Sequence, residues 1–197
     1  MRPSVGIITI ACGSAKYLRW AEALGRSLAL HCPDLPRVLV SDLAKADTPY
    51  HETIEPDRAE GGCALKLNLY DISPFEDTLF LDADCIVLSN LGPVIEKMRG
   101  RPVAFIGERI SSGWWYMDVP AILKRIGRPS LPKFNSGLMF FDKSDQAARV
   151  FSRARDVSHR FGEYGISDPY GRIADEPCFA IAMAEEEIDT VDEDGTI

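Results

Sequence analysis

The sequence predicts a single α/β domain built on a mostly parallel sheet. Its 197 residues suit one domain, and 46% hydrophobic with 26% charged residues is the composition of an ordinary globular protein. Strand and helix patterns alternate through the first half of the chain. The composition excludes a disordered chain, a collagen-like repeat and a disulfide-dense miniprotein, and no apolar stretch approaches the ~20 residues of a membrane span.

The elements of the first half follow from apolar runs and helical spacing. Continuous β-branched residues are typical of a strand covered on both faces, and apolar residues three or four apart mark the inner face of a helix. The elements expected here are a strand over Val5–Ala11, a helix with Tyr17, Ala21, Leu24 and Leu28 on its inner face, a strand over Arg37–Asp42, a loop over 44–62, a short helix over Ala64–Tyr70 and a strand over Thr78–Leu81. Right-handed crossovers would make these strands parallel.

The second half is less regular but contains two clear helices. Ser144 is a helix N-cap, and proline early in the last helix is well tolerated. The expected elements are a strand over Val103–Gly107, a loop excursion with a short helix over Ser111–Pro132, a strand over Leu138–Phe141, a helix with Ala147, Val150, Phe151, Ala154, Val157 and Phe161 inside and Arg149, Arg153 and Arg160 outside, and a last helix over Asp175–Ala184.

Charge is unevenly distributed along the chain. The net charge is −8, and residues 185–194 hold seven acidic residues and no basic one. Residues 97–172 instead hold fourteen Lys or Arg against seven Asp or Glu. This basic stretch suits a small anionic ligand, or it is a solvated surface; the overall acidity argues against a nucleic-acid partner.

The cysteines indicate a reduced, cytoplasmic protein. There are five of them, an odd number, with no Cys-x-x-Cys pair: Cys12, Cys32, Cys63, Cys85 and Cys178. That pattern favours core thiols over a disulfide framework or a zinc site.

Two aspartates directly follow the third predicted strand. Alternate residues of extended backbone point to the same side, so Asp82 and Asp84 would both face the carboxyl end of the sheet, where ligands of open α/β sheets bind. Two carboxylates there can hold a hard divalent cation that bridges a diphosphate. An acidic turn without function is the plain alternative.

Together with its surroundings, this segment resembles glycosyltransferase family 8, the glycogenin-like family. Lys66-Leu-x-x-Tyr70 precedes Asp82-Ala-Asp84, and the lysine stands 16 positions before the first aspartate. Asn135-Ser-Gly137 is similar to the family's Asn-Ser/Ala-Gly segment, and Asp175-Glu176 to its Asp-Gln or Asp-Glu pair. The resemblance implies a single GT-A-like domain over 1–184, with a mostly parallel Rossmann-like sheet covered by helices on both faces. Residues 185–197 would be an acidic C-terminal tail.

The resemblance also assigns roles to residues. Asp84 would ligate Mn²⁺ (or Mg²⁺), and Asp82 would share the metal and reach the ribose of a UDP-sugar donor. Tyr17 would stack on uracil, whose edge would meet the backbone of Ala11, Cys12 and Gly13. Lys66 would approach the diphosphate or donor sugar, and Asn135 and Asp175 would lie around the donor sugar and the acceptor face. The implied reaction is transfer of a sugar, with retention, to a carbohydrate or glycoconjugate acceptor.

Several alternatives stay open. The family's later His-x-x-Gly-x-x-Lys segment has no counterpart in this sequence, which leaves room for a nucleotide-sugar-binding protein with little or no turnover. Phe80-Leu-Asp-Ala-Asp84 also resembles the first motif of haloacid-dehalogenase-type phosphatases, although that motif normally ends the first strand. Trp114-Trp-Tyr116 is either loop packing or a contact for an acceptor sugar. Tyr17, Lys66, Asn135 and Asp175 each have a purely structural explanation as core, surface, turn or cap residues.

Overall fold

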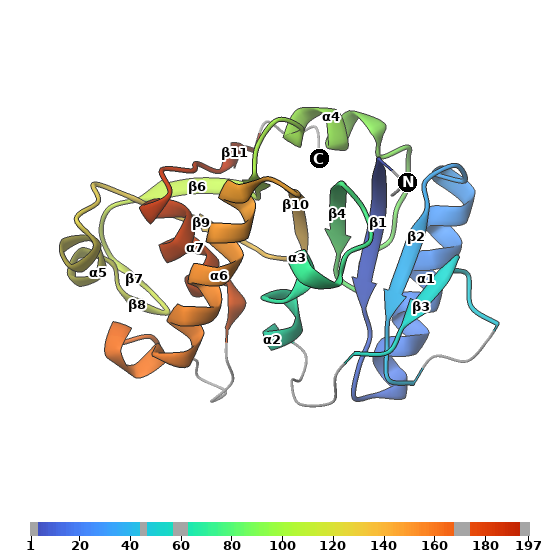
Figure 1. Ribbon diagram of the computed structural model, residues 1–197, viewed down its shortest axis with the longest axis horizontal. Coiled ribbons are helices and arrows are strands. Elements are labelled where there is room, and N and C mark those ends of the chain that lie inside the picture. The colour runs from blue at the N-terminus through green and yellow to red at the C-terminus, as the bar shows by residue number, and fades with distance from the viewer. Residues whose placement is uncertain (1–3, 44–46, 57–62, 168–173, 194–197) are drawn as a thin grey trace.

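A six-stranded sheet in the order β3-β2-β1-β4-β10-β5 forms the centre of the computed structural model, which describes residues 4–43, 47–56, 63–167 and 174–193 (Figure 1). Neighbours among β1, β2, β3 and β4 pair in parallel, whereas β10 is antiparallel to both of its neighbours. The strands are β1 (Val5–Ile10), β2 (Arg37–Val40), β3 (Glu52–Ile54), β4 (Asp77–Leu81), β5 (Val103–Ala104) and β10 (Leu138–Asp142). The prediction of a mostly parallel α/β sheet is confirmed.

Helices cover both faces of this sheet, as predicted. Side chains alternate between faces along a strand, so Leu79 of β4 packs with Leu24 and Met98, and Phe80 packs on the opposite face with Phe151 and other core residues. The helices involved are α1 (Ala15–His31) and α4 (Gly92–Met98) on the first face, and α6 (Asp145–His159) and α7 (Asp175–Glu185) on the second. The N-cap at Ser144 is confirmed, because its hydroxyl accepts a hydrogen bond from the Ala147 amide at 3.2 Å.

A smaller unit lies beside the main sheet, together with α6 and α7 (Figure 1). Its sheet has the order β11-β6-β9, and a hairpin and a helix accompany it. The elements are β6 (Ile106–Ile110), β7 (Trp114–Trp115), β8 (Met117–Asp118), α5 (Val119–Ile126), β9 (Leu131–Phe134), the 3₁₀ helix η1 (Phe161–Tyr164) and β11 (Val191–Asp192). Because Val191 pairs with Ile106, the fold continues past residue 184 into the acidic segment. The domain boundary at 184 stays a prediction.

The predicted loop over 44–62 is wrong in part, since it contains β3. This strand pairs in parallel with β2 at the edge of the sheet, where Glu52 and Thr53 are exposed and Ile54 is half-buried. An edge strand that buries so little has no apolar pattern for the sequence to reveal. Residues 44–46 and 57–62 of the same prediction lie outside the described part of the chain.

Two further elements are divided where one was expected. The helix predicted over Ala64–Tyr70 is two short helices, α2 (Cys63–Lys66) and α3 (Leu69–Ile72). Leu65, Leu67 and Leu69 are all buried, and a spacing of two cannot face one side of a straight helix, so the chain bends between them.

The strand predicted over Val103–Gly107 is likewise split between β5 and β6, which belong to different sheets. The chain changes sheet at Phe105, whose fully buried ring stacks on Phe134 with centroids 3.9 Å apart. In the excursion over Ser111–Pro132 the short helix is confirmed as α5, but the β7–β8 hairpin and β9 were missed because two-residue strands and a proline give no strand pattern.

Part of the basic stretch forms ion pairs with the acidic segment. Arginines of residues 97–172 form ion pairs with acids of residues 185–189, and these pairs are Arg109–Asp189, Arg128–Glu187, Arg149–Glu186 and Arg153–Glu185. These four arginines therefore do not converge on a shared anionic ligand. Four of the eight side chains are well exposed, and ion pairs at such positions contribute little to stability.

The prediction of core thiols is confirmed in part, for two of the four cysteines whose side chains are described. Cys12, Cys32, Cys85 and Cys178 are free thiols; Cys32 and Cys178 are buried, and the other two are half-buried. The Cys63 side chain lies outside the described part of the chain. Within the described residues, none of the helices has the length and apolar character needed to cross a membrane.

Candidate functional site

Lys66 and Asp82 form an ion pair at the carboxyl end of β4. The Lys66 Nζ lies 2.9 Å from Asp82 Oδ1 and 3.2 Å from Oδ2, so the ammonium faces both oxygens of the carboxylate. Lys66 is only 8% exposed and its Nζ also lies 5.1 Å from the centroid of the Phe80 ring. Lys66 is the last residue of α2, and the burial of its side chain keeps the ammonium largely away from solvent.

Asp175 and Ser136 complete the surroundings of the lysine. Lys66 Nζ donates to Ser136 Oγ at 3.0 Å and to the Ser136 carbonyl at 3.4 Å. Asp175 Oδ2 lies 3.7 Å from Nζ and has no hydrogen-bond partner within the described structure, although Asp175 is 4% exposed. Asp175 is the first residue of α7, where the helix dipole favours a negative charge. The lysine therefore holds two carboxylates from distant parts of the chain.

The Asn135–Gly137 turn closes over this ion pair. The Asp82 amide donates to the Gly137 carbonyl at 2.8 Å, and the Gly137 amide donates to Asn135 Oδ1 at 2.8 Å. A Cβ on Gly137 would lie 2.8 Å from Asn135 Oδ1 and 3.4 Å from Asp82 Oδ2. A Cβ here would therefore displace the Asn135 side chain, whereas its distance from Asp82 is an ordinary contact.

The site carries more negative than positive charge among its described residues. Burial raises the pKa of the Asp82 carboxyl, and the nearby Asp175 and Asp84 add to this, while the Lys66 ammonium opposes it. Asp84 is exposed, so its carboxylate is available to solvent or to a ligand. Asp82, Asp84 and Asp175 together exceed the charge of Lys66, an arrangement that favours a bound cation.

The donor set fits a hard divalent cation. Carboxylate oxygens are the ligands that Mg²⁺ and Mn²⁺ prefer, and Mg²⁺ is commonly held by one or two carboxylates with phosphate oxygens of the substrate. Asp82 and Asp84 would supply two such ligands. Within the described residues there is no group of three or more His, Cys, Asp or Glu side chains placed to hold a metal ion by themselves.

The loop after β1 lies next to these aspartates. Ala83, between the two aspartates, belongs to the same buried cluster as Ala11. The Gly13 amide donates to Asp42 Oδ1 at 3.0 Å, which ties the loop to the end of β2. Gly13 has a φ of 77°, a conformation that glycine adopts readily. Burial raises the pKa of the Cys12 thiol in this loop, so the thiol is protonated.

Tyr17 is exposed, and its assignment to the inner face of the first helix is wrong. It lies in the first turn of α1, is 44% exposed and packs edge-on against Trp20 with centroids 5.7 Å apart. Lys16 Nζ lies 4.3 Å from the Trp20 ring. The remaining predicted inner residues, Ala21, Leu24 and Leu28, are fully buried. The exposed ring is thus available to a ligand at the end of β1.

The structure brings most of the predicted site residues together. Lys66, Asp82 and Asp175 are in one ion-pair cluster, Asn135 is in the turn above it, and the Ala11–Gly13 loop is adjacent. Ser136, Glu176 and Asp42 were not assigned to the site from sequence. Ser136 and Glu176 stand inside segments already compared with the family. Asp42 is the last residue of a predicted strand, so a systematic inspection of strand ends would have found it.

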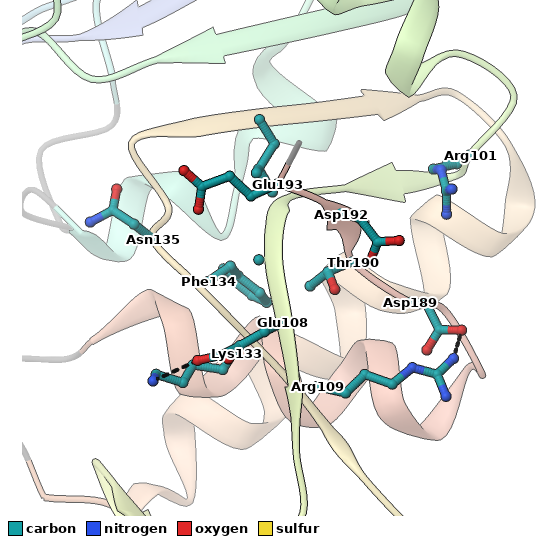
Figure 2. A pocket seen from close by; sticks show the side chains of 12 residues that line it. Arg101, Glu108, Arg109, Lys133, Phe134, Asn135, Asp189, Thr190, Asp192 and Glu193 are labelled. Carbon is teal, nitrogen blue, oxygen red and sulfur yellow. Dashed lines mark hydrogen bonds and ion pairs between the residues drawn. The ribbon is translucent and has the colours of Figure 1, made fainter. Parts of the chain in front are cut away.

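A separate groove of about 1220 Å³ lies over the small sheet and includes Asn135 (Figure 2). Within it, Lys133 pairs with Glu108 at 2.9 Å and Arg109 pairs with Asp189. Neither Lys66 nor the two aspartates line this groove. The four acidic residues of the lining outnumber its three basic ones, so the groove suits a diphosphate less well than the end of β4 does.

Solved glycosyltransferases share this arrangement of strands and helices. Glycosyltransferase GlyE of Streptococcus pneumoniae TIGR4 matches 95% of the chain with a TM-score of 0.64 at 13% identity. Galactosyltransferase LgtC, solved with donor and acceptor sugar analogues, matches 94% with a TM-score of 0.60 at 12% identity. The chain has the fold of these glycosyltransferases. A putative nucleotide-diphospho-sugar transferase of Desulfovibrio desulfuricans G20 matches 97% of the chain with a TM-score of 0.52 at 9% identity.

The match covers different shares of the other proteins. The chain spans 45% of GlyE, 72% of LgtC and 80% of the Desulfovibrio protein. No protein-family model and no curated protein matches the sequence. At these identities the comparisons establish the GT-A-like fold, and membership of glycosyltransferase family 8 stays a prediction.

Proposed function

We propose that this protein is a metal-dependent glycosyltransferase that moves a sugar from a UDP-sugar to a carbohydrate or glycoconjugate acceptor, with retention at the anomeric carbon. The observation that carries the proposal is the Lys66–Asp82–Asp175 cluster beside the exposed Asp84 at the carboxyl end of β4. In an open α/β sheet this edge is where nucleotides bind. Support for sugar transfer, in place of another nucleotide reaction, comes from the fold shared with GlyE and LgtC.

In this proposal Asp84 and Asp82 hold Mn²⁺ or Mg²⁺. The cation would neutralise the diphosphate as its bond to the sugar breaks. Asp84 is the exposed ligand, whereas Asp82 is oriented by Lys66 from below. Because Lys66 is buried and already faces Asp82, its first task would be to fix that carboxylate and to supply positive potential beneath the leaving diphosphate.

The nucleotide would lie along the loop after β1. The backbone of Ala11, Cys12 and Gly13 would meet the uracil edge, and the exposed Tyr17 ring would stack on the base. The Asp42 carboxylate holds the Gly13 amide, which fixes the loop conformation before the nucleotide binds. A loop held in its binding conformation loses less entropy on binding.

The acceptor would approach from the side of Asn135 and the β7–β8 hairpin. The rings of Trp115 and Phe134 pack with their centroids 6.1 Å apart, so Trp115 is part of the core packing. Trp114 is instead 68% exposed. An exposed indole offers a flat surface on which a sugar ring can stack. We therefore assign Trp114 to acceptor contact and Trp115 to packing.

A thermal-shift panel of nucleotides and nucleotide sugars, with and without Mn²⁺, tests the proposal. A ligand at 100 times its Kd stabilises the folded state by about 2.7 kcal/mol, an easily measured shift for a chain of this size. We expect UDP and a UDP-sugar to stabilise the protein only when Mn²⁺ is present. Stabilisation without the metal, or by none of the nucleotides, would contradict the proposal.

A second assay separates the competing activities. Slow, Mn²⁺-dependent hydrolysis of a UDP-sugar without acceptor is expected of a transferase. Metal-dependent UDP binding with no such hydrolysis would instead indicate a nucleotide-sugar-binding protein. Steady hydrolysis of a generic aryl phosphate that is lost in Asp82→Asn would indicate a phosphatase.

A further inference from the structure

Tyr116 has an unusual backbone conformation at the tip of the β7–β8 hairpin. Its φ is 58°, and Glu187 is the other non-glycine residue with a positive φ among the described residues. This left-handed region is unfavourable for a bulky side chain and persists where surrounding contacts enforce it. One such contact is the Ser167 amide, which donates to the Tyr116 carbonyl at 2.8 Å.

The Tyr116 side chain reaches the opening of α7. Its hydroxyl donates to Glu176 Oε2 at 2.6 Å, while Glu176 Oε1 accepts the Ser136 amide at 3.2 Å. The carboxylate is thereby held at both oxygens, by the hairpin on one side and by the Asn135–Gly137 turn on the other. All three residues are at least half-buried, so these charge-assisted hydrogen bonds are protected from competing water.

The same turn holds the ion pair of the proposed donor site. Ser136 accepts hydrogen bonds from Lys66 through its hydroxyl and its carbonyl, and Gly137 accepts one from the Asp82 amide. A continuous chain of hydrogen bonds therefore runs from Tyr116 through Glu176 and Ser136 to Lys66. Tyr116 contacts neither Lys66 nor Asp82 in any of these bonds.

We propose that Tyr116 is a positioning residue that fixes Glu176, and through it the Asn135–Gly137 turn, over the donor site. The inference rests on the proposed function, since it assigns Tyr116 to the geometry of that site. This role is consistent with the left-handed backbone of Tyr116, because in this conformation its phenol reaches Glu176 at the start of α7. The bond to Glu176 also links the hairpin that carries Trp114 to the donor side of the site.

A double-mutant cycle tests this role through the hydrolysis of a UDP-sugar in the presence of Mn²⁺. We expect Tyr116→Phe to lower kcat about 10-fold, since a hydrogen bond to a charged group is lost, while the Kd of UDP changes less than 2-fold. In a Glu176→Gln background the same change should cost less than 3-fold, because the charged acceptor is already gone. Equal losses in both backgrounds, or a matching loss of UDP affinity, would overturn the proposal.

A matched control and a readout independent of activity complete the experiment. Tyr164→Phe also removes a buried phenol hydroxyl, one bonded to Arg153 at 2.8 Å, and should leave kcat unchanged. Hydrogen exchange of the Ser136 amide should speed up at least 5-fold in Tyr116→Phe and stay unchanged in Tyr164→Phe. If the unaltered protein neither binds UDP nor hydrolyses the UDP-sugar, the proposed function fails, whereas unchanged Ser136 exchange in Tyr116→Phe refutes the positioning role by itself.

Discussion

Replacing Lys66 with Met should destabilise the protein in a pH-dependent way. The change removes the ammonium that lies 2.9 Å from Asp82 and 3.7 Å from Asp175. Both carboxylates then lose the positive charge of Lys66. Breaking a fully buried pair costs about 3–5 kcal/mol, but the Asp82 side chain is 35% exposed and water screens part of its charge. We therefore expect a loss of about 2–3 kcal/mol at neutral pH, a fall in Tm of about 5–10 °C.

The sign of the pH dependence follows from Asp82. Its pKa is already raised in the folded protein by burial, and removing Lys66 would raise it further. A carboxyl with a raised folded pKa favours the folded state at low pH and destabilises it as the pH rises through that value. The stability deficit of Lys66→Met should therefore be smaller at pH 5 than at pH 8.

Urea unfolding at these two pH values measures the effect. The double variant Lys66→Met/Asp82→Asn should recover part of the loss at pH 8, because the unpaired carboxylate is gone. Lys124→Met, at an exposed position of α5, serves as the control and should change stability by less than about 0.5 kcal/mol. A deficit that is equal at both pH values, or that the double variant does not reduce, would refute the assignment of Lys66 as the counter-ion.

Two other variants test separate parts of the account. Trp114→Ala should raise the KM for the acceptor about 5–10-fold without changing the Kd of UDP. The control Leu30→Ala, at a residue 74% exposed, should change neither constant. An unchanged acceptor KM in Trp114→Ala would refute the assignment of Trp114 to acceptor contact. Burial raises the pKa of Tyr50 from 10.0 to about 12, so the folded state should lose about 2 kcal/mol relative to Tyr50→Phe as the pH rises from 9 to 12. If the free energy of unfolding changed equally with pH in the two proteins over that range, the buried, protonated phenol of Tyr50 would be contradicted.

The sequence predicted the regular part of the fold because that part has strong periodicity. The β-branched run of β1, the inner face of α6 and the proline early in α7 each gave a physical signal, and each element is present. What the sequence did not reveal depends on contacts between distant residues. The edge strand β3 pairs with β2 through its backbone, and Phe105 redirects the chain because it stacks on Phe134.

Part of the candidate site could also be predicted from the sequence. Asp82 and Asp84 end an apolar strand, which marks them from sequence alone, and Lys66 was found through the resemblance to glycosyltransferase family 8. The pairing of Lys66 with Asp175, across more than a hundred residues, required the structure. So did the bond from Tyr116 to Glu176, since Trp114-Trp-Tyr116 stands in an irregular segment where spacing carries no information about what the side chains face.

The central claim is that a divalent cation joins a nucleoside diphosphate to the end of β4, and calorimetric titration of UDP tests it most directly. We expect heat of binding when Mn²⁺ is present, little or none without the metal, and a loss of binding in Asp84→Ala, a surface change that should leave Tm unaltered. UDP that binds Asp84→Ala as tightly as the unaltered protein, or binds equally well without metal, would contradict the account.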